Sequence, residues 1–232
     1  MPSPRFEIRA CASEFIGTFA LVFAGTCAIV ANDTGGGAIT HVGISLTFGL
    51  TVLAMIFALG DVSGAHLNPA VSLGFFAARR LPGAKAAAYV LSQTAGAFAA
   101  SGLLRWIFPA HGNLGATLPS IALPQAFVLE VVLTCVLMLV ILAVSTGSKE
   151  KGMFAGIAVG AVVALEALFA GPLTGASMNP ARSLAPAIVS GHLGSLWIYL
   201  VAPLVGALLA VPLCWCTQAP GCCPPATEGE PA

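Results

Sequence analysis

The sequence predicts an all-α membrane protein with six transmembrane helices and two re-entrant half-helices, arranged as an inverted repeat. Three observations support this prediction. The 232-residue chain is 58% hydrophobic and only 8% charged, whereas soluble domains carry about 25% charged residues. Six apolar segments are long enough to cross the hydrocarbon core of a bilayer, which requires about 20 residues. Two short segments that open with Asn-Pro-Ala, at 68–70 and 179–181, occur in matching settings in the two halves of the chain.

Polar or Gly/Pro-rich breaks separate the six predicted spans. The first span follows Arg5 and Arg9, as the apolar part of a signal peptide would, but it contains Glu14. A signal peptide rarely contains an acid at such a position, so we expect this segment to remain in the protein as a membrane helix. The predicted spans are 10–31, 40–60, 84–106, 123–145, 152–171 and 194–216.

These spans are expected to form one domain over residues 1–216, with halves at about 10–106 and 123–216. The remaining residues, 217–232, are rich in proline and contain cysteine, and we predict a disordered tail.

The two halves share a second repeated pattern besides Asn-Pro-Ala. Glu14 and Thr18 in SEFIGTF correspond to Glu130 and Thr134 in LEVVLTC. Each half therefore has three spans, with a short apolar segment between the second and the third. An odd number of spans makes the halves cross the membrane in opposite directions, and inverted repeats of this kind place discontinuous helices near the midplane.

Basic residues predict the orientation, because cytoplasmic loops are enriched in Lys and Arg. With six spans, all but one of the basic residues outside the motifs fall on the same side, and only Arg105 lies on the other. We therefore expect both termini in the cytoplasm. The protein is expected in the cell (inner) membrane. The basic residues on the shared side are Arg5, Arg9, Arg79, Arg80, Lys85, Lys149 and Lys151.

The two Asn-Pro-Ala segments, 68–78 and 179–189, are apolar but too short to cross the membrane. Asn caps helices and Pro suits the first helical turn, so each segment is predicted to be a half-helix that begins at its motif. Two half-helices that enter from opposite faces would meet with their N-termini at the centre. Their partial positive charge and their Asn amide donors would bind oxygen atoms of a passing molecule and repel cations.

Residues 13–212 resemble the aquaporin, or major intrinsic protein, family through the paired motifs, the paired Glu-x-x-x-Thr segments and the Arg182 that follows the second motif. The resemblance implies a passive channel for water and small uncharged solutes that excludes protons and ions, without enzyme activity, cofactor or bound metal. It also implies a homotetramer in the lipid bilayer with one pore in each subunit. Nothing in the charge distribution suggests a nucleic-acid partner.

The resemblance also implies roles for particular residues. The outer selectivity filter is placed by spacing: Phe48 is twenty positions before Asn68, while Ala167 and Ala176 are twelve and three positions before Asn179. Glu14 and Glu130 are expected to be structural buried acids that accept hydrogen bonds from the loops before the half-helices. The predicted pore residues are Asn68, Pro69, Ala70, Asn179, Pro180 and Ala181, and the predicted filter residues are Phe48, Ala167, Ala176 and Arg182.

The sequence carries features of more than one branch of the family, and these differ in the solutes they indicate. GPLTGASMNPARS resembles the solute-permeable and nodulin-like branches of the family, whereas Ser183 and Ala187 follow the water-channel pattern. The small side chains of Ala167 and Ala176 favour water together with solutes such as glycerol, urea or metalloid hydroxides, including arsenite. The alternative is a strict water channel, and more distant alternatives are a non-conducting scaffold and an intramembrane enzyme.

Some residues keep alternatives open. Glu166 is expected at the pore mouth, against a neighbouring subunit or beside Arg182. His66 is expected to be a pore histidine bonded to backbone, in preference to a pH gate. Gly156 and Gly160 predict close helix packing. Four cysteines near the C-terminus could bind a soft metal, although incidental cysteines in a tail are the favoured interpretation: Cys214, Cys216, Cys222 and Cys223.

Overall fold

A computed structural model describes residues 4–146 and 152–218, so Lys149, Lys151 and most of the predicted tail lie outside the described residues. The described part of the chain is helical and contains no strand, which agrees with the predicted fold class. Its helices are α1 (Pro4–Thr34), α2 (Thr40–Ser63), α3 (Pro69–Ala77), α4 (Gly83–Ile107), α5 (Leu123–Val144), α7 (Ala155–Thr174), α8 (Pro180–Ser190) and α9 (Leu196–Thr217).

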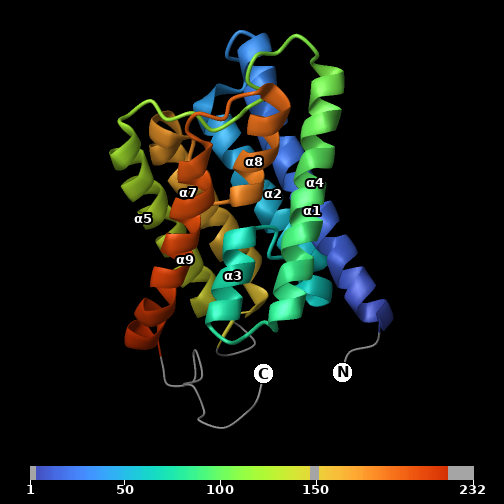
Figure 1. Ribbon diagram of the computed structural model, residues 1–232, viewed down its shortest axis with the longest axis vertical. Coiled ribbons are helices and arrows are strands. Elements are labelled where there is room, and N and C mark those ends of the chain that lie inside the picture. The colour runs from blue at the N-terminus through green and yellow to red at the C-terminus, as the bar shows by residue number, and fades with distance from the viewer. Residues whose placement is uncertain (1–3, 147–151, 219–232) are drawn as a thin grey trace.

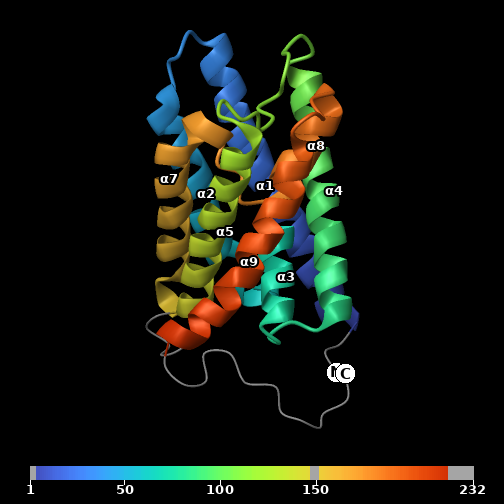
Figure 2. The ribbon, with the colours of Figure 1, turned by 60° about the vertical axis from the view of Figure 1, so that its left-hand side comes forward.

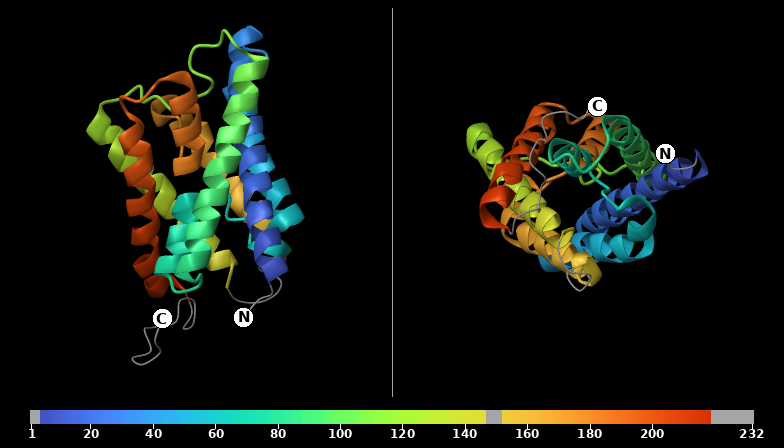
Figure 3. Two further views of the ribbon diagram at one scale, coloured as in Figure 1. Left: turned by 45° about the vertical axis from the view of Figure 1, so that its right-hand side comes forward. Right: turned by 90° about the horizontal axis from the view of Figure 1, so that it is seen from below.

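The six long helices surround the two short ones. Seen end on, α1, α2, α4, α5, α7 and α9 form a ring (Figure 3). Helix α3 lies in the lower half of the bundle and α8 in the upper half (Figures 1 and 2), and both contact α4 and α9. Helix α1 begins and α9 ends at the same end of the bundle (Figure 1). The order of elements, α1–α4 followed by α5–α9, is therefore the predicted inverted repeat.

Among the described residues, five helices are long and apolar enough to cross a membrane by length and composition: α1, α2, α5, α7 and α9. The sixth long helix, α4, has 25 residues but a more polar centre. Its Gln93 is buried and donates to Glu14 over 2.7 Å, and its Thr94 donates to the carbonyl of Val90. The amide nitrogen of Gln93 and the hydroxyl of Thr94 are thus satisfied inside the protein, which lets α4 occupy the same environment as the other five helices. The Oε1 atom of Gln93 has no hydrogen-bond partner among the described residues.

The helix bounds differ from the predicted spans mainly at their ends. Helix α2 continues to Ser63 and is closed by Gly64 in the left-handed conformation, at φ 91°. Helix α7 was expected to end at residue 171, before Pro172. It instead runs through that proline to Thr174 and is closed by Gly175 at φ 86°. Proline removes one hydrogen bond from a helix but does not end it when the freed carbonyl finds another partner.

Helices α2 and α7 approach closely through glycines. A Cβ atom on Gly49 would lie 2.4 Å from the carbonyl oxygen of Gly160, and one on Gly160 would lie 2.6 Å from that of Gly49. One turn away, a Cβ on Gly156 would be 2.9 Å from the ring of Phe57. The predicted close packing at Gly156 and Gly160 is confirmed, and any larger residue would push these helices apart.

Candidate functional site

The two motif asparagines begin the half-helices. The Oδ1 atom of Asn68 accepts a hydrogen bond from the N–H of Ala70 over 2.9 Å, and Asn179 accepts from Ala181 over 3.0 Å and from Arg182 over 3.3 Å. In both motifs the following proline occupies the first helical turn. Each half-helix thus starts with a side-chain cap and a residue that needs no N–H partner.

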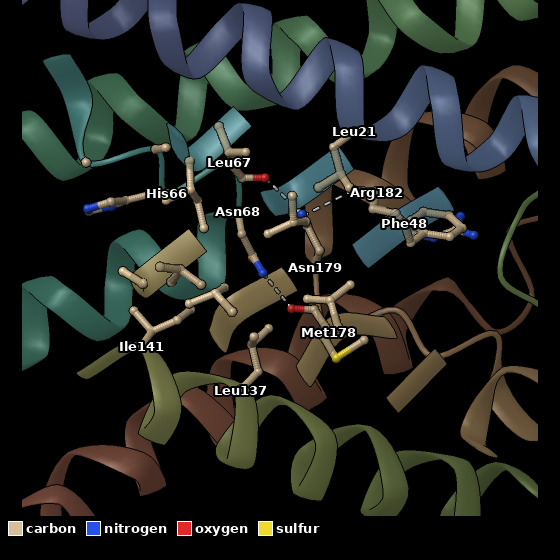
Figure 4. A pocket seen from close by; sticks show the side chains of 18 of the residues that line it. Leu21, Phe48, His66, Leu67, Asn68, Leu137, Ile141, Met178, Asn179 and Arg182 are labelled. Atoms are coloured by element: carbon tan, nitrogen blue, oxygen red, sulfur yellow. Dashed lines mark hydrogen bonds between the residues drawn. The ribbon is translucent and has the colours of Figure 1, made fainter. Parts of the chain in front are cut away.

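Each asparagine also binds the opposite half of the protein. The Nδ2 atom of Asn68 donates to the carbonyl of Met178 over 2.8 Å, and Nδ2 of Asn179 donates to that of Leu67 over 2.9 Å (Figure 4). An asparagine amide has two hydrogens, and these contacts use one of them. The second hydrogen of each amide remains to serve the cavity, which both asparagines line.

Two buried acids hold the loops that precede the half-helices. Glu14 accepts from the N–H groups of His66 and Leu67 over 2.9 and 2.8 Å. Glu130 accepts from those of Ser177 and Met178 over 2.9 and 3.0 Å.

A hydroxyl group beside each of these two acids binds one further N–H group of the loop. Ser63 donates to Glu14 and accepts from the N–H of Ala65, while Thr174 donates to Glu130 and accepts from the N–H of Ala176. Three consecutive N–H groups in each half are therefore turned toward an acid and its hydroxyl.

This arrangement turns backbone carbonyls toward the cavity. In a trans peptide the C=O points opposite to the N–H. The carbonyls of residues 64–66 and 175–177 therefore point away from the acids, and all six of these residues except Gly175 line the cavity. The loops adopt left-handed conformations at residues other than glycine, a strain that persists where surrounding contacts enforce it. The residues are Ala65, Leu67, Ala176 and Met178, with φ between 41° and 53°.

The four predicted filter residues are brought together. Phe48 from α2, Ala167 from α7, Ala176 from the second loop and Arg182 from α8 are buried and line the same cavity. The guanidinium carbon of Arg182 lies 4.9 Å from the centre of the Phe48 ring, and Figure 4 shows the two side chains together. The ring they form has one charged wall and otherwise apolar walls.

Sequence reasoning missed the segment that holds Arg182 in place. The connection between α4 and α5 folds inward, so that Leu114 and Thr117 are buried. The carbonyl of Gly115 accepts from the Nη1 atom of Arg182 over 2.8 Å, and Thr117 donates to the hydroxyl of Ser183 over 2.8 Å. The only sequence signal in this irregular segment was its length, which exceeds that of a simple helix connection.

The structure places His66 and Glu166 differently from some of the expectations. The Nδ1 atom of His66 pairs with the hydroxyl of Ser72 at 3.1 Å, so the expected backbone partner for this imidazole is wrong. Glu166 is only 2% exposed and is absent from the cavity lining; it lies near Glu130 and Cys135 of α5. Its Oε2 atom has no hydrogen-bond partner among the described residues.

The cavity connects these features into one path. It has a volume of about 120 Å³ and extends from Phe48 and Arg182, past both asparagines, to Val144 and Ser145. Most of its other lining is aliphatic, including Leu21 and Leu137. A small polar molecule can follow such a path, because it finds hydrogen-bond partners at a few fixed points and meets only apolar walls between them.

Comparison with known proteins agrees with this geometry. Residues 2–213 match the family described as Major intrinsic protein. Aquaporin NIP1-4 of Oryza sativa subsp. japonica is 48% identical over 208 residues, which cover 89% of this chain and 76% of that protein. Nodulin-26 of Glycine max is 43% identical over 202 residues, which cover 87% of this chain and 74% of that protein.

A solved structure shares the fold. The X-ray structure of the aquaglyceroporin from Plasmodium falciparum superposes with a TM-score of 0.80 at 29% identity, covering 89% of this chain and 95% of that one. Together with the family match, this likeness identifies the chain as a multi-pass integral membrane protein of the major intrinsic protein family.

Proposed function

We propose that this chain is a passive channel that conducts water and small uncharged solutes through the cavity between its halves and excludes protons and ions. Its similarity to proteins named as aquaporins, and to an aquaglyceroporin structure, supports a channel and not an enzyme. One observation carries the proposal: Asn68 and Asn179, from opposite halves, cap the two half-helices side by side in an otherwise apolar cavity.

Water and hydroxyl groups can cross this cavity because it supplies both donors and acceptors. The loop carbonyls of the two halves accept hydrogen bonds, and the free amide hydrogens of Asn68 and Asn179 donate them at the centre. A molecule that leaves bulk water therefore regains part of its hydrogen bonding at these points. The apolar walls between them bind nothing strongly, so the molecule can move on.

Charge exclusion follows from the same arrangement. Each half-helix presents the equivalent of about +0.5 elementary charge at its N-terminus, and Arg182 adds a full positive charge at the filter. Cations and protons meet this positive region in a site where water screens little. Anions would have to shed their hydration shells along aliphatic walls, which offer them no compensating partners.

The filter supports a solute range wider than water. Ala167 and Ala176 present only methyl groups opposite Arg182, and Phe48 supplies an aromatic face. A solute with a hydroxyl edge and an apolar or bulky remainder fits such a ring. We propose glycerol, urea and neutral metalloid hydroxides such as arsenite as candidates, and a strict water channel is the alternative.

We further propose that both termini are cytoplasmic and that the protein is a homotetramer in the cell (inner) membrane. The connection from α3 to α4, with Arg79 and Arg80, and the first turn of α4, with Lys85, lie at the end of the bundle where α1 begins (Figure 1). Basic residues at such connections favour the cytoplasm. The outer surface carries large exposed apolar side chains suited to lipid or to neighbouring subunits. Among them are Leu91, Trp106 and Val128.

Stopped-flow light scattering on proteoliposomes tests the proposal. We expect osmotic shrinkage much faster than in protein-free liposomes, and faster entry of glycerol, urea and boric acid, with no added proton flux as reported by an enclosed pH-sensitive dye. Water flux without flux of any of these solutes would instead establish the strict water channel. Absence of both fluxes in correctly folded protein would favour the non-conducting scaffold and contradict the proposal.

A further inference from the structure

Helix α7 contains a backbone carbonyl that its own helix cannot satisfy. Pro172 has no N–H, so the carbonyl of Leu168, four residues earlier, loses its intrahelical donor. In the apolar part of a membrane protein such a carbonyl must find another partner. Leu168 directly follows the filter residue Ala167 in the chain, so the place where α7 is weakened is next to the outer constriction.

The missing donor comes from another helix. The Nε2 atom of His41, near the start of α2, lies 2.9 Å from the carbonyl oxygen of Leu168. A carbonyl can only accept, so Nε2 carries the hydrogen in this contact. Gly171 makes the approach possible, because a Cβ atom there would lie 2.6 Å from the Cε1 atom of His41. Proline, glycine and histidine thus form one inter-helix contact between residues 127 positions apart.

This contact and a second one bound the segments of α2 and α7 that carry Phe48 and Ala167. The second is the close approach of Gly49 and Gly160, eight residues from His41 along α2 and eight from Leu168 along α7. Eight residues correspond to about 12 Å of helix. Phe48 lies seven residues after His41, on nearly the same face of α2. The two filter side chains contributed by long helices, those of Phe48 and Ala167, are therefore carried on helix segments fixed at both ends.

We propose that His41 is a positioning residue for the outer constriction: by holding α2 against α7 at Leu168, it sets the permeability ratio of larger solutes to water. His41 itself does not line the cavity. Its effect is transmitted through the spacing of Phe48 and Ala167, which the loss of this contact between α2 and α7 would let increase. This inference rests on the proposed channel function and adds a residue that determines its selectivity.

The test uses substitutions that remove or restore one hydrogen bond. His41→Leu keeps a side chain of similar bulk that cannot donate a hydrogen bond. The amide nitrogen introduced by His41→Gln can instead occupy the place of Nε2 and donate to the Leu168 carbonyl. Pro172→Ala restores the N–H that the Leu168 carbonyl lacks, so it should make His41 dispensable. The proteins are purified as full chains, their folded fraction is measured by size exclusion, and each is compared in proteoliposomes with the wild type for glycerol and water permeability per molecule.

We expect His41→Leu to raise the glycerol-to-water permeability ratio by about fivefold, the factor that corresponds to one hydrogen bond of typical net strength. His41→Gln and Pro172→Ala should keep the wild-type ratio, and the double variant with His41→Leu and Pro172→Ala should return to it. A purely structural role would lower the folded fraction of His41→Leu without changing the ratio, and that result would overturn the inference. An altered ratio that Pro172→Ala fails to restore would also overturn it.

The two proposals fail in different ways. If the folded wild type conducts no water, the channel function itself fails and the ratio has no meaning. If the wild type conducts water and glycerol but the ratio is the same in His41→Leu, only the positioning role of His41 fails.

Discussion

The guanidinium group of Arg182 is held between the ring of Phe48, 4.9 Å from its centre, and the carbonyl of Gly115, which accepts from Nη1 over 2.8 Å. The side chain is buried, and a desolvated cation–π contact contributes about 2 kcal/mol. Arg182 is therefore a fixed charged wall of the cavity and not a mobile surface charge. Its position is set by residues from α2 and from the connection between α4 and α5.

Replacing Arg182 should separate water conduction from proton exclusion. In Arg182→Val the filter loses its positive charge and becomes wider, so proton flux should rise while water flux persists. The measurement is the rate of internal pH change in dye-loaded proteoliposomes under a pH gradient. Arg182→Lys keeps the charge without the planar fork and serves as the control. Proton flux as low in Arg182→Val as in the wild type would show that this charge does not contribute to the barrier.

Asn179→Leu should strongly reduce water permeability. The change removes one of the two central amide donors, and an unmet hydrogen bond costs about 1–3 kcal/mol, which corresponds to a fall in water permeability of about 5- to 150-fold. Stopped-flow light scattering measures the fall. Gln125→Leu removes an amide from an exposed position on α5 and should leave permeability unchanged. Wild-type water flux through folded Asn179→Leu protein would rule out the central role of this asparagine.

Ala167→His should narrow the solute range. An imidazole at this position fills the ring next to Arg182 and adds a second polar wall, so glycerol flux should fall more than water flux. Ala161→His, the same change at an exposed position of α7, is the matched control. Comparing glycerol and water permeabilities of the two variants tests the interpretation of the filter. Equal reductions of both fluxes in Ala167→His would mean that Ala167 does not determine solute size.

Glu14→Gln should destabilise the protein more than Glu130→Gln. Replacing a carboxylate oxygen by NH2 at Glu14 strands two donors, such as the N–H of Leu67 and the amide of Gln93. At Glu130 the same change can be accommodated with the loss of only one hydrogen bond, the one that the N–H of Met178 donates. A hydrogen bond to a charged group contributes about 1.5–3 kcal/mol, so the unfolding free energies should differ by about that amount. Thermal unfolding in detergent checks the order, and equal midpoints would contradict it.

Much of the architecture could be predicted because short sequence patterns indicate it. The apolar spans require only length and composition, and the half-helices follow from Asn followed by Pro at the start of a short apolar segment. The repetition of Glu14 at Glu130, and of Asn68 at Asn179, predicted the inverted relation of the halves. Each of these signals is a short motif, or the repetition of one, and can be recognised in the sequence without knowing which distant segments are in contact.

What could not be predicted depends on contacts that leave no pattern in the sequence, most of them between distant segments. The end of α7 was placed too early because proline normally ends a helix, and the donor that rescues it, His41, is far away in the chain. Gly115 and Thr117 lie in an irregular segment whose course is set by Arg182 and Ser183. The Ser72 partner of His66 was missed because a six-residue separation across a turn into α3 gives no pattern by itself.

The exchanged asparagine bonds have a consequence for how the protein is made. A ribosome delivers the first half to the membrane while the second is still being synthesised, so at that stage the amide of Asn68 and the carbonyl of Leu67 have not met Met178 and Asn179. Unpaired polar groups are costly in hydrocarbon, so the early half must keep its centre hydrated or screened by the insertion machinery. The conducting path is consequently the last part of the molecule to form, because the hydrogen bonds between its two halves can form only when both halves are in the bilayer.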